Sequence, residues 1–170
     1  MNISAEPLSR NKIGNIARTL RKLIGFDDSL YFPIVHFIEW VLTNPDNDMG
    51  LEFEIVGKDE MEDTYGKTNT ARNAMLIRED VYDGAVKGNP RDRFTLCHEL
   101  GHYILHQPSC ISYARGDIPV YCKPEWQANT FAAELMAPRE LVKNMTVNEI
   151  MQQCGMSRKA ATIQYSECRK

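Results

Sequence analysis

The sequence predicts an α+β fold in which helices surround a small twisted sheet. Six segments have the apolar spacing or the capping signals of helices, and two shorter segments have the composition of strands. With 170 residues, of which 43% are apolar and 25% charged, the chain is long enough for a proper core and typical of a globular protein. We therefore expect one domain over residues 1–170.

The composition argues against several classes of protein. A net charge of −3 does not suit a protein that coats nucleic acid through bulk charge. The first seven residues lack the apolar core of a signal peptide, and no apolar run approaches the ~20 residues of a membrane span. The 5 cysteines are odd in number and lack CxxC spacing, so we expect reduced thiols in a cytoplasmic protein without membrane contact.

The first half of the chain starts with two expected helices. Residues 9–25 form an amphipathic pattern that ends at Gly25, and its basic side is interpreted as a solvated surface rather than a docking face. The residues of that basic side are Arg10, Lys12, Arg18, Arg21 and Lys22. Pro33 can open a second helix over residues 34–43, and a polar turn over residues 44–48 ends it.

The expected strands follow. Residues 51–56 alternate apolar and acidic side chains, which predicts a strand with one wet face. Residues 57–70 are polar and expected to be loop, and residues 74–78 predict the second strand. Residues 81–88 fit either a hairpin turn or a helical bend.

A helix with a clear start comes next. Asn89 is its expected cap and Pro90 its first turn, and the helix should end before Pro108. Gly101 in its interior costs about 1 kcal/mol relative to alanine, which indicates the close approach of another backbone.

The last third contains three more expected helices. Residues 109–123 read as a loop or short strand, and residues 124–137 as a helix that begins at a proline. Over residues 144–170, a capping box at Thr146, a glycine in the turn and a cap at Ser157 predict a helical hairpin with helix-turn-helix cadence.

The most informative motif is His-Glu-x-x-His, formed by His98, Glu99 and His102. On a helix the two histidines stand one turn apart, with Cβ atoms roughly 5–6 Å from each other, so both imidazoles can reach one tetrahedral metal ion. Glu99 lies about 100° from His98 around the helix axis. Its carboxylate can therefore approach the open coordination position as a general base without being a ligand.

Zinc in a catalytic site needs a third protein ligand. A histidine ten residues after His98 is not available, because Pro108 occupies that position. His106 shares the helix face of the pair but lies a further turn along, so we expect it to be a structural residue or a contact to substrate rather than a ligand.

A glutamate from the next helix is the alternative, and there are two candidates. Glu125 and Glu134 lie nine residues apart, which places them on opposite faces of that helix. Asn129 follows Glu125 by one turn and could orient a ligating histidine through its second ring nitrogen. We therefore predict His98, His102 and Glu125 as ligands of one Zn²⁺ ion, although two histidines and a carboxylate also suit iron.

These residues resemble the ImmA/IrrE family of metallopeptidases, which have a gluzincin-like arrangement. The matching segments are RFTLCHELGHYILH at residues 93–106 and EWQANTFAAELMAP at residues 125–138. The resemblance implies a zincin-like fold, the same three metal ligands and Glu99 as catalytic base. A further implication is that Asn129 orients one of the ligating histidines. It also implies a protein substrate, a helix-turn-helix repressor of a mobile element, phage or stress system.

Two questions stay open at this stage. The donor that stabilises the oxyanion could be His106, Tyr113 or Tyr121. The hairpin over residues 144–170 offers a rival function, a zinc-stabilised regulator that binds DNA or a partner protein without proteolysis.

Overall fold

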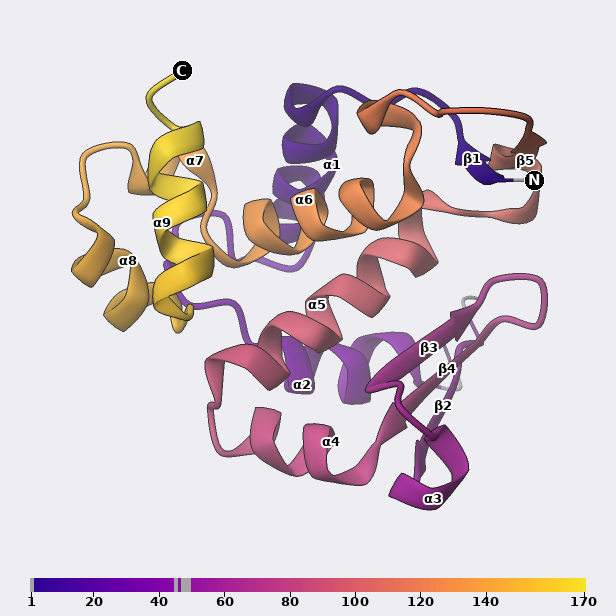
Figure 1. The fold of residues 1–170 in the computed structure, drawn as a ribbon. Helices are drawn as coiled ribbons and strands as arrows, with labels where there is room; N and C mark the ends of the chain where they lie inside the picture. The colour runs from indigo at the N-terminus through magenta and orange to yellow at the C-terminus, as the bar shows by residue number, and fades with distance from the viewer. Residues whose placement is uncertain (1, 45, 47–49) are drawn as a thin grey trace.

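The computed structural model describes residues 2–44, 46 and 50–170, and it has the predicted α+β fold. Helix α5 (Pro90–Leu105) runs through the middle of the molecule (Figure 1). Helix α6 (Pro124–Met136) lies along one side of it, and a three-stranded sheet flanks the other side. The remaining helical segments are α1 (Arg10–Leu23), α2 (Ile34–Phe37), η1 (Ile38–Leu42), α3 (Lys58–Met61), α4 (Glu79–Val86), η2 (Pro108–Cys110), η3 (Val120–Cys122), α7 (Arg139–Val142), α8 (Val147–Cys154) and α9 (Arg158–Glu167).

The three-stranded sheet has the order β2-β4-β3. Strand β2 (Glu52–Val56) pairs in parallel with β4 (Ala74–Arg78), and β3 (Gly66–Asn69) pairs antiparallel with β4. A second sheet joins β1 (Asn2–Ala5) to β5 (Ile111–Ala114), in antiparallel register. Strand β3 is therefore an edge strand, and it lies beside α5 (Figure 1).

The capping signals in the sequence are confirmed. The side chain of Asn89 accepts hydrogen bonds from the amides of the next helical residues, and Pro90 occupies the first turn of α5. Thr146 forms its capping box before α8, and Ser157 caps α9. Gly155 ends α8 with φ of 65°, a left-handed conformation that glycine adopts without steric cost.

Some expectations for the sheet region were wrong or lie outside the described residues. The segment 57–70, expected to be loop, contains α3 and β3. Of the two alternatives for residues 81–88, the helical one is confirmed, because residues 81–86 belong to helix α4. Strand β1 was not predicted. Residues 45, 47 and 48 of the turn expected over residues 44–48 lie outside the described residues.

Two arginines are buried in the core. Arg21, expected on a solvated surface, is fully buried because it extends the face of α1 that carries Ile13 and Ala17. Its guanidinium donates to the carbonyl of Leu135, one of the carbonyls that lack a partner at the end of α6. Arg93 on α5, 1% exposed, donates to the carbonyls of Cys154, Gly155 and Phe32 at 3.0, 2.9 and 2.6 Å.

No helix among the described residues combines the length and the apolar character that crossing a membrane requires.

Candidate metal centre

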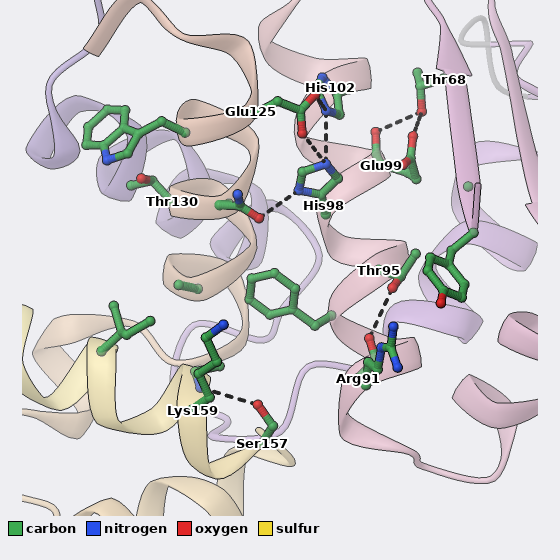
Figure 2. Close-up of a pocket in the computed structure, with 18 of the residues that line it drawn as sticks. Thr68, Arg91, Thr95, His98, Glu99, His102, Glu125, Thr130, Ser157 and Lys159 are labelled. Carbon is green, nitrogen blue, oxygen red and sulfur yellow. Dashed lines mark hydrogen bonds and ion pairs between the residues drawn. The ribbon is translucent and has the colours of Figure 1, made fainter. Parts of the chain in front are cut away.

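A cleft of about 1100 Å³ lies over α5. One wall comes from β3 and the residues before it, and the opposite wall comes from α6 and α9. Figure 2 shows His98, Glu99 and His102 on the helix between these walls, with Thr68 of β3 on one side and Glu125 of α6 on the other. The motif of the sequence therefore faces an open cavity rather than the core.

Three side chains converge at this point. The Nε2 atoms of His98 and His102 lie 3.0 Å apart, and each lies 3.3 Å from a carboxylate oxygen of Glu125. Around a tetrahedral zinc ion with bonds of about 2.0–2.1 Å, neighbouring ligand atoms are about 3.3 Å apart. The two 3.3 Å contacts go to different carboxylate oxygens, Oε2 beside His98 and Oε1 beside His102, and each has the spacing of neighbouring ligands of one such ion. The group is therefore suited to a metal ion by both geometry and ligand type.

The two helices approach closely enough to make this possible because of Gly101. A Cβ atom placed on Gly101 would lie 3.1 Å from both Cα and the carbonyl oxygen of Ala128. Gly101 lies between the two histidines in sequence, and Ala128 lies between Glu125 and Asn129. The prediction that another backbone packs on this glycine is confirmed, and the contact sets the distance between the imidazoles and the carboxylate.

Each imidazole has a partner for its second nitrogen. Nδ1 of His98 lies 3.0 Å from Oδ1 of Asn129, and Nδ1 of His102 lies 2.9 Å from Nδ1 of His106. These contacts leave both Nε2 atoms directed at Glu125 (Figure 2).

The charges of the cluster are strongly coupled. Hydrogen bonds from His102 and His98 hold the pKa of the Glu125 carboxyl well below its usual range. Burial alone would lower the pKa of His98, but the hydrogen bond and charge of Glu125, with the charge of Glu99, outweigh burial and raise it. The cluster therefore favours an ionised carboxylate, which is the form that binds a cation.

Glu99 occupies a separate position. It lines the cleft with only 6% of its surface exposed, and it is not among the three residues whose donor atoms converge. The hydroxyl of Thr68 donates to Oε2 of Glu99 at 2.7 Å and also lies 3.1 Å from the backbone carbonyl of the same residue. Thr68 was missed from sequence because its segment was expected to be loop.

The residues suggested as oxyanion donors or substrate contacts do not reach the cleft. His106 is 5% exposed and lies behind His102, where burial lowers its pKa to about 4. Tyr113 on β5 and Tyr121 in η3 are exposed elsewhere, and none of the three is among the described residues that line the cavity. Of the two alternatives for His106, a structural residue or a substrate contact, its burial at the C-cap of α5 favours the structural one.

Glu134 faces away from the cluster, as its helical position predicted. It is 2% exposed, and its carboxylate lies 2.9 Å from Nε of Arg139 and 3.7 Å from Nη1 of Arg10. Arg10 is thus an ion-pair partner rather than a freely solvated charge.

The C-terminal hairpin forms part of the site. Residues of α9 and its cap, including Ser157, Lys159 and Ile163, line the far end of the cleft. Figure 2 shows Ser157 and Lys159 on the same side of the cavity as Thr130 of α6.

Comparison with known families agrees with this geometry. The model of the peptidase family described as the IrrE N-terminal-like domain matches residues 60–163, more than half of the chain. The chain belongs to this family. The match includes β3, α5, α6 and most of α9, and it confirms the resemblance to the ImmA/IrrE metallopeptidases. The protein is therefore a metallopeptidase, a hydrolase of peptide bonds. A search of curated proteins found no match.

Proposed function

We propose that the protein is a zinc-dependent endopeptidase in which His98, His102 and Glu125 hold one zinc ion. The observation that carries this proposal is the convergence of two Nε2 atoms, 3.0 Å apart, on the Glu125 carboxylate, whose Oε2 lies 3.3 Å from His98 and whose Oε1 lies 3.3 Å from His102. Asn129 would orient His98 through the ring nitrogen that faces away from the metal. Family membership supports peptide hydrolysis over the rival function without proteolysis.

The chain's own residues would perform the proton transfers. When bound, zinc would supply a Lewis acid that polarises the scissile carbonyl and makes water more acidic. Glu99 would take a proton from the attacking water and deliver it to the amine that leaves. The hydroxyl of Thr68 would hold one oxygen of Glu99 in place, so that the other oxygen faces the reacting atoms.

The cleft suits a polypeptide chain. Its volume of about 1100 Å³ is at or above the upper end of the ~300–1,000 Å³ of small-molecule pockets. Strand β3 is an edge strand, and an extended segment could add to it by main-chain hydrogen bonds. We infer that the substrate runs along β3, across the motif helix, towards α9.

The substrate we propose is a helix-turn-helix repressor of a mobile element, phage or stress system, cleaved in the cytoplasm. This part rests on the resemblance to ImmA/IrrE peptidases. DNA contact through residues 144–170 is less well supported, because Lys159 and Ile163 of the second hairpin helix line the cleft. Arg158, a further candidate for phosphate contact, donates a hydrogen bond to Asn148 at 3.1 Å.

The decisive experiment replaces Glu99 by Gln and measures metal content and cleavage separately. The purified variant should retain zinc at the parent stoichiometry, while cleavage of co-expressed helix-turn-helix repressors should fall by about 10²–10⁴-fold. Glu54→Gln, at an exposed carboxylate on β2, is the matched control and should cleave like the parent. If Glu99→Gln cleaves at the parent rate, the role of the base is wrong. If His98→Ala retains zinc, the ligand set is wrong.

A further inference from the structure

Behind His102, a chain of buried side chains leads away from the metal centre. Nδ1 of His102 lies 2.9 Å from Nδ1 of His106, and Nε2 of His106 lies 3.0 Å from Oε1 of Gln127. Nε2 of Gln127 then donates to two backbone carbonyls, those of Glu6 and Tyr121, both at 2.7 Å. His106 is 5% exposed and Gln127 is completely buried.

The two carbonyls determine the direction of every hydrogen bond in this chain. A carbonyl oxygen can only accept, so the amide of Gln127 must direct its NH₂ group at Glu6 and Tyr121, and its oxygen at His106. Nε2 of His106 must then carry a proton, because it faces an acceptor. A neutral imidazole has one N–H, so Nδ1 of His106 is an acceptor, and Nδ1 of His102 must donate to it.

The result of this direction is a single tautomer for His102. With its proton on Nδ1, the lone pair of Nε2 points at the site shared with His98 and Glu125. A ligating histidine needs this form, and an oriented acceptor for its other nitrogen also fixes the plane of the ring.

We propose that His106 and Gln127 are positioning residues that lock the tautomer and orientation of His102, a role that rests on the metal centre of the proposed function. Two segments far from the motif supply the anchor: the residue after strand β1, through the carbonyl of Glu6, and η3, through that of Tyr121. The two histidine ligands are thus supported differently. His98 depends on Asn129, which is exposed, whereas His102 depends on a chain closed to solvent.

Long-range ¹H–¹⁵N NMR of histidine-labelled protein at pH 8 tests the tautomers directly. In the metal-free parent, His106 should show the Nε2–H form and His102 the Nδ1–H form. An Nδ1–H signal for His106 would overturn the proposal. This measurement needs neither zinc nor a substrate, so its failure is distinct from a failure of the proposed peptidase activity.

Zinc affinity, measured by competition with a chelator, tests the consequence. His106→Phe keeps a buried ring but removes the acceptor, and we expect about 10–100-fold weaker zinc binding. His106→Asn, whose carbonyl oxygen can accept from Nδ1 of His102, should recover most of that loss. Gln127→Met keeps the length of the side chain and should also weaken zinc binding. A purely structural role for His106 predicts equal losses in the Phe and Asn variants, and that outcome would refute the proposal.

Discussion

Substitution of Gly101 by alanine tests how the helix contact sets the metal centre. The new Cβ would lie 3.1 Å from Cα and the carbonyl oxygen of Ala128, whereas ordinary contacts of this kind are 3.4–4 Å. Both are backbone atoms of α6, so relief requires the two helices to separate by a few tenths of an ångström. The distances from the carboxylate oxygens of Glu125 to Nε2 of His98 and of His102, 3.3 Å each, would lengthen by a similar amount.

The expected magnitudes follow from this displacement. Metal sites tolerate ligand distances within about ±0.2 Å, so zinc affinity should fall by roughly tenfold or more. Overpacking costs about 1–3 kcal/mol, and the better helix propensity of alanine returns about 1 kcal/mol, so the metal-free protein should lose about 0–2 kcal/mol of stability.

Zinc competition with a chelator and denaturant unfolding of the metal-free protein measure the two effects. Gly84→Ala in α4 is the control, because its Cβ would meet the side-chain atoms Oδ2, Cγ and Cβ of Asp92 rather than the backbone of α6. The control should bind zinc like the parent. Parent-like zinc affinity in Gly101→Ala would refute the idea that this contact fixes the distance between the ligands.

Two further outcomes are expected. Thr68→Val removes the hydroxyl that donates to Glu99, a hydrogen bond to a charged group that is worth about 1.5–3 kcal/mol. Cleavage should therefore slow by about 10–100-fold at unchanged zinc content. Equal cleavage rates in the parent and the variant would contradict this role of Thr68. The raised pKa of His98 stabilises the metal-free fold below about pH 6.5, and this contribution is lost as the pH rises through the raised value. Zinc binds only the unprotonated ring. The gain in Tm on adding zinc should therefore be larger at pH 8 than at pH 6. Thermal scans with zinc or with EDTA check this, and a larger gain at pH 6 would contradict it.

The sequence was most informative where local chemistry decides the structure. The caps Asn89 and Ser157 define helix starts through hydrogen bonds within one turn, so these boundaries could be predicted without the fold. The choice of Glu125 over Glu134 used only helical periodicity, and the structure brings Glu125 to the histidines and directs Glu134 to Arg139.

The sequence was least informative where tertiary contacts decide. Strand β3 is four residues long and polar, and its sequence has no alternation of apolar and polar residues. It forms through its pairing with β4 and its packing beside α5, which the local sequence does not reveal. Thr68 could not be recognised as a partner of Glu99 without that strand. Arg21 carries a charge that composition assigns to the surface, yet in the core two of its guanidinium nitrogens donate to the carbonyls of Leu135 and Ser29.

Likewise, His106 could be placed on the face of the histidine pair, but its partner Gln127 comes from the next helix. Tyr113 and Tyr121 belong to a segment whose path depends on pairing with β1, so their distance from the cleft could not be inferred.

The buried guanidinium of Arg93 has a consequence for how a substrate protein can enter. It lies on α5 five residues before His98 and binds the loop between α8 and α9 at two carbonyls, so that hairpin and the motif helix should behave as one rigid piece. A hydrogen bond that involves a charged group is worth about 1.5–3 kcal/mol, so breaking both of these would cost too much for a routine gating motion. If the cleft widens, we therefore expect the short polar strand β3 to move rather than the hairpin of α8 and α9.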